Sequence, residues 1–294
     1  MARPFLLLVL LWTLALVLLG SIVHATESSL ACPDWPTCFG TMMPEMTGGV
    51  FWEHLHRLWA GALLLLFPAA VMLTRRAHPD RKALFRLGLA GIALLFFQAL
   101  LGGLTVIYRL PDAISTSHLA MALVFLGIVT VMLVRTAPGV TERGADPRSD
   151  GRLAWRVGCW ITGLVFLQSL VGAVVRHTDA GMACPDIPLC LGRVIPPLEY
   201  PAVQLHFAHR VLGVALAVAV VMFARTILTR SRDAFSRRLA AAAAIGVVGQ
   251  VLLGFASVAF RLGVPWVSAH SVLAATLLTL GVAMAAHSWK RAPQ

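Results

Sequence analysis

The chain is organised around the stretch FWEHLHRLWAG, residues 51–61, which begins an apolar segment of membrane-spanning length. This stretch contains a carboxylate, two imidazoles and a guanidinium. Ionisable side chains within a membrane-spanning helix are costly and are therefore functional candidates. Glu53 and His56 are three residues apart and share one helix face, whereas His54 points elsewhere. A second copy, HFAHR at residues 206–210, repeats the pattern but has a histidine where the first has Glu53.

The composition indicates a polytopic membrane protein. Hydrophobic residues make up 59% of the 294 residues and charged residues only 13%, whereas a soluble domain has about 25% charged residues. The net charge is +11, but the basic residues gather in short loops, where they set the topology of a membrane protein. The charge therefore does not predict a nucleic-acid-binding protein.

The hydropathy pattern predicts an all-α fold with eight transmembrane helices. The apolar segments fall near residues 5–24, 51–74, 85–108, 113–135, 155–175, 204–228, 237–260 and 264–287, and each is long enough to span a bilayer. Because Arg and Lys concentrate on one side, we expect both termini in the cytoplasm. The two long loops, about 25–50 and 176–203, then lie on the outer face of the cell membrane.

An internal repeat divides the chain into two similar halves. CPDWPTC at residues 32–38 matches CPDIPLC at residues 184–190, at an offset of 152. The same offset relates Gly20 to Gly172, Gln98 to Gln250, Gly102 to Gly254, Arg109 to Arg261 and His118 to His270. We therefore predict two tandem four-helix bundles, residues 1–138 and 155–294, joined by a cytoplasmic linker, 139–154. An even number of helices per repeat makes the halves parallel, related by a pseudo-twofold axis along the membrane normal.

Four histidines are candidate iron ligands: His56, His118, His209 and His270. Each lies about six residues into its predicted helix, so all four are at a similar depth, roughly 9 Å below the outer surface. Two imidazoles at equal depth in one bundle can bind a flat macrocycle from both sides, and imidazole is a common axial ligand of haem iron. Zinc is disfavoured because no third or fourth ligand is near in either half.

Three charged residues accompany these histidines. Arg57 and Arg210 directly follow His56 and His209, and each could pair with a haem propionate or extend to water as an interfacial arginine. Glu53 could transfer protons or stabilise a developing cation. Its alternative is an interfacial ion pair with Arg57 or Arg109. Because its counterpart is His206, we expect the first site to carry the chemistry and the second to support it.

The cysteines Cys32, Cys38, Cys184 and Cys190 form two closely spaced pairs in the predicted outer loops, where an oxidising compartment allows disulfides to persist. A structural disulfide is the favoured interpretation for Cys184 and Cys190. For Cys32 and Cys38, which are near Glu53, a redox role remains open. Cys159 stands alone in an apolar segment and is interpreted as a core residue.

Taken together, the residues quoted above resemble the haem A synthase family, which assembles cytochrome oxidase by converting haem O to haem A. The resemblance rests on Glu53-x-x-His56-Arg57, on His118, on His209-Arg210, on His270, and on an outer loop with cysteines in each half. It implies that His56 and His118 hold the substrate haem, that His209 and His270 hold a permanent haem b, and that Glu53 is the catalytic carboxylate. The family oxidises one methyl group of haem O to a formyl group.

The resemblance also implies partners. Haem O would be delivered by a haem O synthase, an electron acceptor is required, membrane lipid surrounds the chain, and homo-oligomerisation is left open. Two other function classes compete with this interpretation. A bis-histidyl membrane cytochrome b that exchanges electrons with quinol would explain the duplicated histidines but not the single Glu53. A thiol–disulfide carrier would not need four histidines.

Overall fold

The computed structural model describes residues 2–77, 81–137 and 150–289. Within these ranges the chain forms eight long helices and one short 3₁₀ helix: α1 (Ala2–Ala25), α2 (Gly48–Ala77), α3 (Arg81–Ile107), α4 (Asp112–Arg135), α5 (Asp150–His177), η1 (Ala180–Met182), α6 (Pro201–Arg230), α7 (Ala234–Ala259) and α8 (Val264–Ser288). All eight long helices are apolar enough to cross a membrane, which confirms the predicted fold class.

The helices extend beyond the predicted spans at most of their ends. The largest difference is at α5, which begins at Asp150 instead of residue 155. Hydropathy marks only the part of a helix that matches the hydrocarbon layer, whereas backbone hydrogen bonds continue the helix into its polar flanks.

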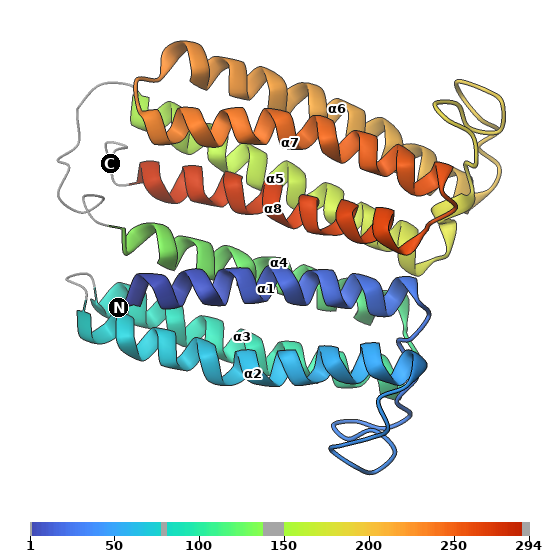
Figure 1. The fold of residues 1–294 in the computed structure, drawn as a ribbon. Helices are drawn as coiled ribbons and strands as arrows, with labels where there is room; N and C mark the ends of the chain where they lie inside the picture. Colours follow the sequence, from blue (N-terminus) through green and yellow to red (C-terminus); the bar gives the residue numbers. More distant parts are fainter. Residues whose placement is uncertain (1, 78–80, 138–149, 290–294) are drawn as a thin grey trace.

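The second half repeats the helix packing of the first. Helices α1 and α3 each pack against α2 and α4, and in the same way α5 and α7 each pack against α6 and α8. Contacts between the halves run through α1 with α8, α4 with α5, and α4 with α8. Figure 1 shows α1–α4 grouped on one side of the molecule and α5–α8 on the other.

The loop backbones repeat as well. Residues with left-handed backbone conformation recur in pairs 152 apart: Glu27 and Asp179, Phe39 and Leu191, Gly40 and Gly192, Arg109 and Arg261, Leu110 and Leu262. Because few non-glycine residues adopt this conformation, the matched positions show that the sequence repeat is also a repeat of local structure.

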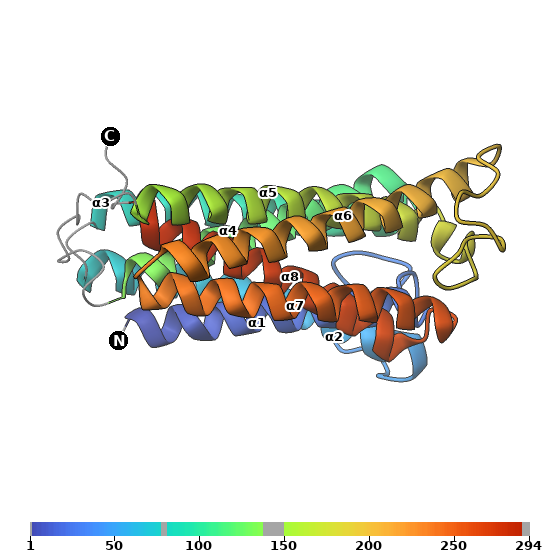
Figure 2. The ribbon, with the colours of Figure 1, turned by 90° about the horizontal axis from the view of Figure 1, so that it is seen from above.

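The two cysteine-containing loops lie at one end of the molecule. They follow α1 and α5, whereas the start of α1 and the end of α8 lie at the opposite end (Figures 1 and 2). The interpretation of Cys159 as a core residue was wrong, because its side chain is exposed on α5. In a membrane protein the outward face of a helix meets lipid, so an apolar side chain need not be in the core.

Candidate functional site

Each of the four histidines lies against a glycine of the preceding helix. A Cβ atom added to Gly20 would lie 3.2 Å from Cε1 of His56, and one added to Gly172 would lie 2.9 Å from Cε1 of His209. The same arrangement brings Gly102 to His118 and Gly254 to His270, both at 3.2 Å. The glycines that match in the repeat therefore make room for the imidazole rings inside the bundles.

The structure brings the histidines together in two pairs. His56 is in electrostatic range of His118, and His209 of His270. Within the described residues, none of the four Nε2 atoms forms a hydrogen bond with the protein, so this nitrogen is available in every ring. Paired imidazoles with a free Nε2, packed on glycines inside a helical bundle, fit the axial ligation of a haem iron.

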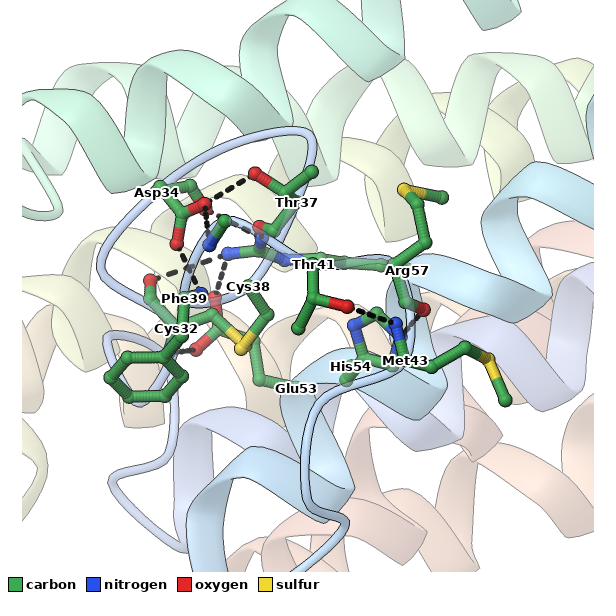
Figure 3. Close-up of a disulfide and its surroundings, with 12 residues drawn as sticks. Cys32, Asp34, Thr37, Cys38, Phe39, Thr41, Met43, Glu53, His54 and Arg57 are labelled. Atoms are coloured by element: carbon green, nitrogen blue, oxygen red, sulfur yellow. Dashed lines mark hydrogen bonds and ion pairs between the residues drawn. A yellow bond between two sulfur atoms is a disulfide. The ribbon is translucent and has the colours of Figure 1, made fainter.

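Glu53 is buried beneath the first cysteine loop, with 5% of its surface exposed. Its Oε2 accepts a hydrogen bond from the backbone N–H of Cys32 at 2.8 Å, and its Oε1 accepts one from Nη2 of Arg57 at 2.5 Å. The ion pair with Arg57 that the sequence allowed is therefore formed. Figure 3 shows the carboxylate beside the Cys32–Cys38 disulfide.

Arg57 connects α2 to the same loop (Figure 3). Its Nη1 donates to the carbonyl oxygens of Asp34 at 2.7 Å and Thr37 at 2.5 Å, and its Nη2 lies 3.4 Å from the carbonyl oxygen of Cys32. Only 12% of the side chain is exposed. The guanidinium thus holds the loop over the N-terminal end of α2. The sequence analysis missed this role.

The second cysteine loop is held in the same way. Nη1 of Arg210 donates to the carbonyl oxygens of Asp186 and Leu189, both at 2.8 Å, and its Nη2 donates to that of Cys184. The backbone nitrogen of Cys184 lies 3.3 Å from Nδ1 of His206, the residue that replaces Glu53. Glu53 and His206 therefore share a structural position under their loops, and only the first is a carboxylate.

Both cysteine pairs form disulfides. The Cα atoms are 4.8 Å apart in Cys32–Cys38 and 4.6 Å apart in Cys184–Cys190. His54, which the sequence placed on a different face from Glu53, is buried near the first disulfide, and its Nε2 lies 3.0 Å from the carbonyl oxygen of Met42.

The first cysteine loop also contains an internal brace. Asp34 accepts hydrogen bonds from the hydroxyl of Thr37 and from the backbone N–H groups of Phe39 and Gly40. The hydrogen bond from Thr37, followed by the one from Gly40, lowers the pKa of the Asp34 carboxyl below its usual value. In the second loop Asp186 accepts from the backbone of Gly192 in the same way.

The sequence analysis also missed Gln168, on α5. Its Nε2 lies 3.0 Å from Nδ1 of His209 and donates to the carbonyl oxygen of His209 at 2.7 Å. The available signal was a polar residue in an apolar helix, at a position where the first half has Leu16.

Comparison with known proteins identifies the family of the chain. The chain matches the family model COX15-CtaA, described as cytochrome oxidase assembly protein, over residues 3–49 and 45–282. It is 35% identical over 213 residues to a heme A synthase of Symbiobacterium thermophilum, covering 70% of this chain and 68% of that protein. It is 30% identical over 331 aligned positions to a heme A synthase of Caulobacter vibrioides, covering 92% and 91%. The chain therefore belongs to the COX15-CtaA family of cytochrome oxidase assembly proteins.

Proposed function

We propose that this chain is a haem A synthase, a membrane oxidoreductase that oxidises a methyl group of haem O to the formyl group of haem A for cytochrome oxidase. The observation that carries the proposal is the pair of half-buried histidine sites, each packed on a glycine. Among the described residues, only the first site has a buried carboxylate one helical turn away, at Glu53. Two equal sites would suit an electron relay, whereas one site with an additional carboxylate suits a site that performs chemistry.

In this proposal, His56 and His118 hold the substrate haem O, and His209 and His270 hold a resident haem b. Haem b would supply electron transfer when bound. The imidazoles would hold and orient the macrocycles, and the apolar bundle would exclude water from them. Arg57 and Arg210 contribute to haem binding through the loops that they hold over the two sites.

Glu53 acts on the substrate methyl group. Its charge is held in place by the Cys32 N–H and by Arg57 before any substrate arrives. Removing electrons from a methyl group develops positive charge there, and a preorganised anion in a dry site stabilises such charge. The carboxylate also gives the site a group that can accept a proton.

The proposal extends to the arrangement in the membrane. The two halves, residues 1–138 and 155–294, are tandem bundles related by a pseudo-twofold axis. Of the predicted cytoplasmic linker, 139–154, residues 150–154 belong to α5, and the rest lies outside the described residues. The cysteine loops face outward. A haem O synthase delivers the substrate, water supplies the oxygen atom of the formyl group, and an electron acceptor removes the electrons released.

The test is to replace Glu53 in two ways and to extract the haems from cells that also make haem O. Glu53→Gln keeps an acceptor for the Cys32 N–H but removes the charge. Glu53→His copies the second half, where the imidazole of His206 lies under the loop, and so replaces the carboxylate with a neutral hydrogen-bond acceptor. We expect both variants to fold and retain haem b but to lower haem A formation by about 100-fold or more, as for loss of one preorganised electrostatic group.

Wild-type levels of haem A in both variants would return Glu53 to a purely structural role. The wild-type chain separates the function classes in the same chromatogram. Haem O or haem A beside haem b supports the synthase, whereas haem b alone would support the quinol-linked cytochrome.

A further inference from the structure

We propose that the substrate macrocycle enters and leaves the first bundle through the wall formed by α3, at Gly102 and Gly103, and that Trp35 of the first cysteine loop is the lid of this entry. The inference rests on the proposed function, which requires the haem of the first site to exchange with the membrane while the haem of the second site stays. The lid consists of a side chain and its seat, and the second half has neither.

Two adjacent glycines make the wall of α3 thin beside the first site. Gly102 faces the interior, where a Cβ added to it would lie 3.2 Å from Cε1 of His118. Gly103 lies about 100° further round the helix, on the face that meets lipid in a membrane-spanning helix. That face carries three exposed apolar side chains, those of Phe96, Leu100 and Ile107. At this level α3 therefore has no side chain between the His118 ring and its lipid-facing surface.

Trp35 covers this thin part of the wall from the outside. A Cβ added to Gly103 would lie 2.8 Å from Cδ2 and 2.9 Å from Cε3 of Trp35, so the indole ring rests directly on the glycine. Gly103 is buried as a result, although other residues on its face of α3 are exposed. Trp35 itself is 39% exposed, so protein holds only one side of the ring. Such a ring can leave its seat by rotation about its side-chain bonds.

The backbone that carries Trp35 is held in place while the ring is free to turn. The disulfide of this loop closes the segment, and Nη1 of Arg57 donates to the carbonyl oxygens of Asp34 and Thr37, on either side of Trp35, at 2.7 and 2.5 Å. The N–H that holds Glu53 comes from the same loop. The entry can therefore open without releasing the carboxylate.

The second half lacks both parts of the lid. At the offset of 152, Ile187 stands where the first half has Trp35, and Phe255 stands where it has Gly103. Phe255 is half-buried and is attached to α7 itself. A ring attached to the wall fills it permanently, whereas a ring attached to a loop can move away. This difference fits a first site that exchanges its macrocycle and a second site that keeps it.

The test follows haem O exchange at the first site in the purified full-length chain, held in lipid nanodiscs and carrying His209→Ala so that the second site does not compete. Uptake is measured from vesicles loaded with haem O, and loss by transfer to excess apomyoglobin. We expect Trp35→Ala to raise both rates by about 10-fold or more and to leave the affinity unchanged, because a lid alters only the fraction of time for which the entry is open. Gly103→Ala should act in the same direction with the indole still present, because its Cβ displaces the ring.

The control is Gly61→Ala, on α2 of the same half, where an added Cβ has no obstructing atom within 4 Å. It should leave both rates unchanged. The converse variant, Trp35→Ile with Gly103→Phe, copies the second half and should slow uptake and loss by about 10-fold each. It also keeps the inference testable if Trp35→Ala fails to fold.

Several results would overturn the inference. Rates in Trp35→Ala and Gly103→Ala equal to those of Gly61→Ala would do so. Faster loss with unchanged uptake would do so as well, because that pattern lowers the affinity and reports a direct contact between the indole and the haem. If the chain took up no haem O in a manner that depends on His56, the proposed function itself would fail. Uptake that depends on His56, together with silent lid variants, would refute the inference alone.

Discussion

At the scale of single residues, the two arginines that follow the histidines have a common structural duty. Arg57 and Arg210 each donate hydrogen bonds to carbonyl oxygens of a cysteine loop. Each also donates to a side chain one turn earlier on its own helix, which is Glu53 for Arg57 and His206 for Arg210. Hydrogen bonds from a charged donor contribute about 1.5–3 kcal/mol each. Several such bonds from one guanidinium are therefore enough to keep a short loop closed over the end of its helix.

This duty predicts how the disulfides respond to reduction. Arg210→Gln should release the second loop, so that Cys184–Cys190 is reduced by a mild thiol at least several-fold faster than in the wild type. The measurement is the rate at which new thiols react with a maleimide after the reductant is added. Arg193→Gln is the control, because that side chain is exposed in the same loop. Equal reduction rates in the two variants would show that Arg210 does not hold the loop.

At the scale of the helices, glycines decide where imidazoles fit. On α5, Gly172 faces the ring of His209. A Cβ added to Gly163 would instead meet open space, with no obstructing atom within 4 Å. The two positions share a helix and differ in their neighbours. They therefore separate the effect of helix propensity from the effect of space.

We predict that Gly172→Ala displaces the His209 ring and lowers the amount of haem bound per chain, because a Cβ 2.9 Å from Cε1 forces the ring to move. Gly163→Ala should keep its haem and be neutral or more stable by up to about 1 kcal/mol, as expected for alanine in a helix. Haem content and thermal unfolding of both variants provide the test. Full haem occupancy in Gly172→Ala would show that the His209 ring does not need the space at Gly172.

At the scale of the whole molecule, the two cysteine loops lie at one end and the start of α1 and the end of α8 at the other (Figure 1). We predict that the loop end faces outward. In a Cys159→Ser background, an impermeant maleimide should label Met43→Cys and Val194→Cys in intact cells, because 83% and 77% of these side chains are exposed. A cysteine placed in residues 140–150, most of which lie outside the described part of the chain, should react only after lysis. The opposite labelling pattern would invert the orientation.

The sequence by itself determined the helices, the repeat and the histidine pairs. Spanning helices follow from local hydropathy, and the offset of 152 places His118 and His270 at equivalent positions without any knowledge of packing. Their glycine partners, Gly102 and Gly254, could also be found from the repeat. These features depend on residues near each other in the chain or on the comparison of two copies.

Only the tertiary structure decided which groups lie behind the histidines and the loops. From the sequence, Arg57 was expected to contact a haem propionate or water. In the fold its guanidinium donates to the carbonyl oxygens of Asp34 and Thr37. The sequence predicted no partner for Gln168, whose amide contacts His209, 41 residues later in the chain. A long polar side chain has many rotamers and reaches several neighbours, so its hydrogen bonds are fixed only when packing between helices excludes all but one arrangement.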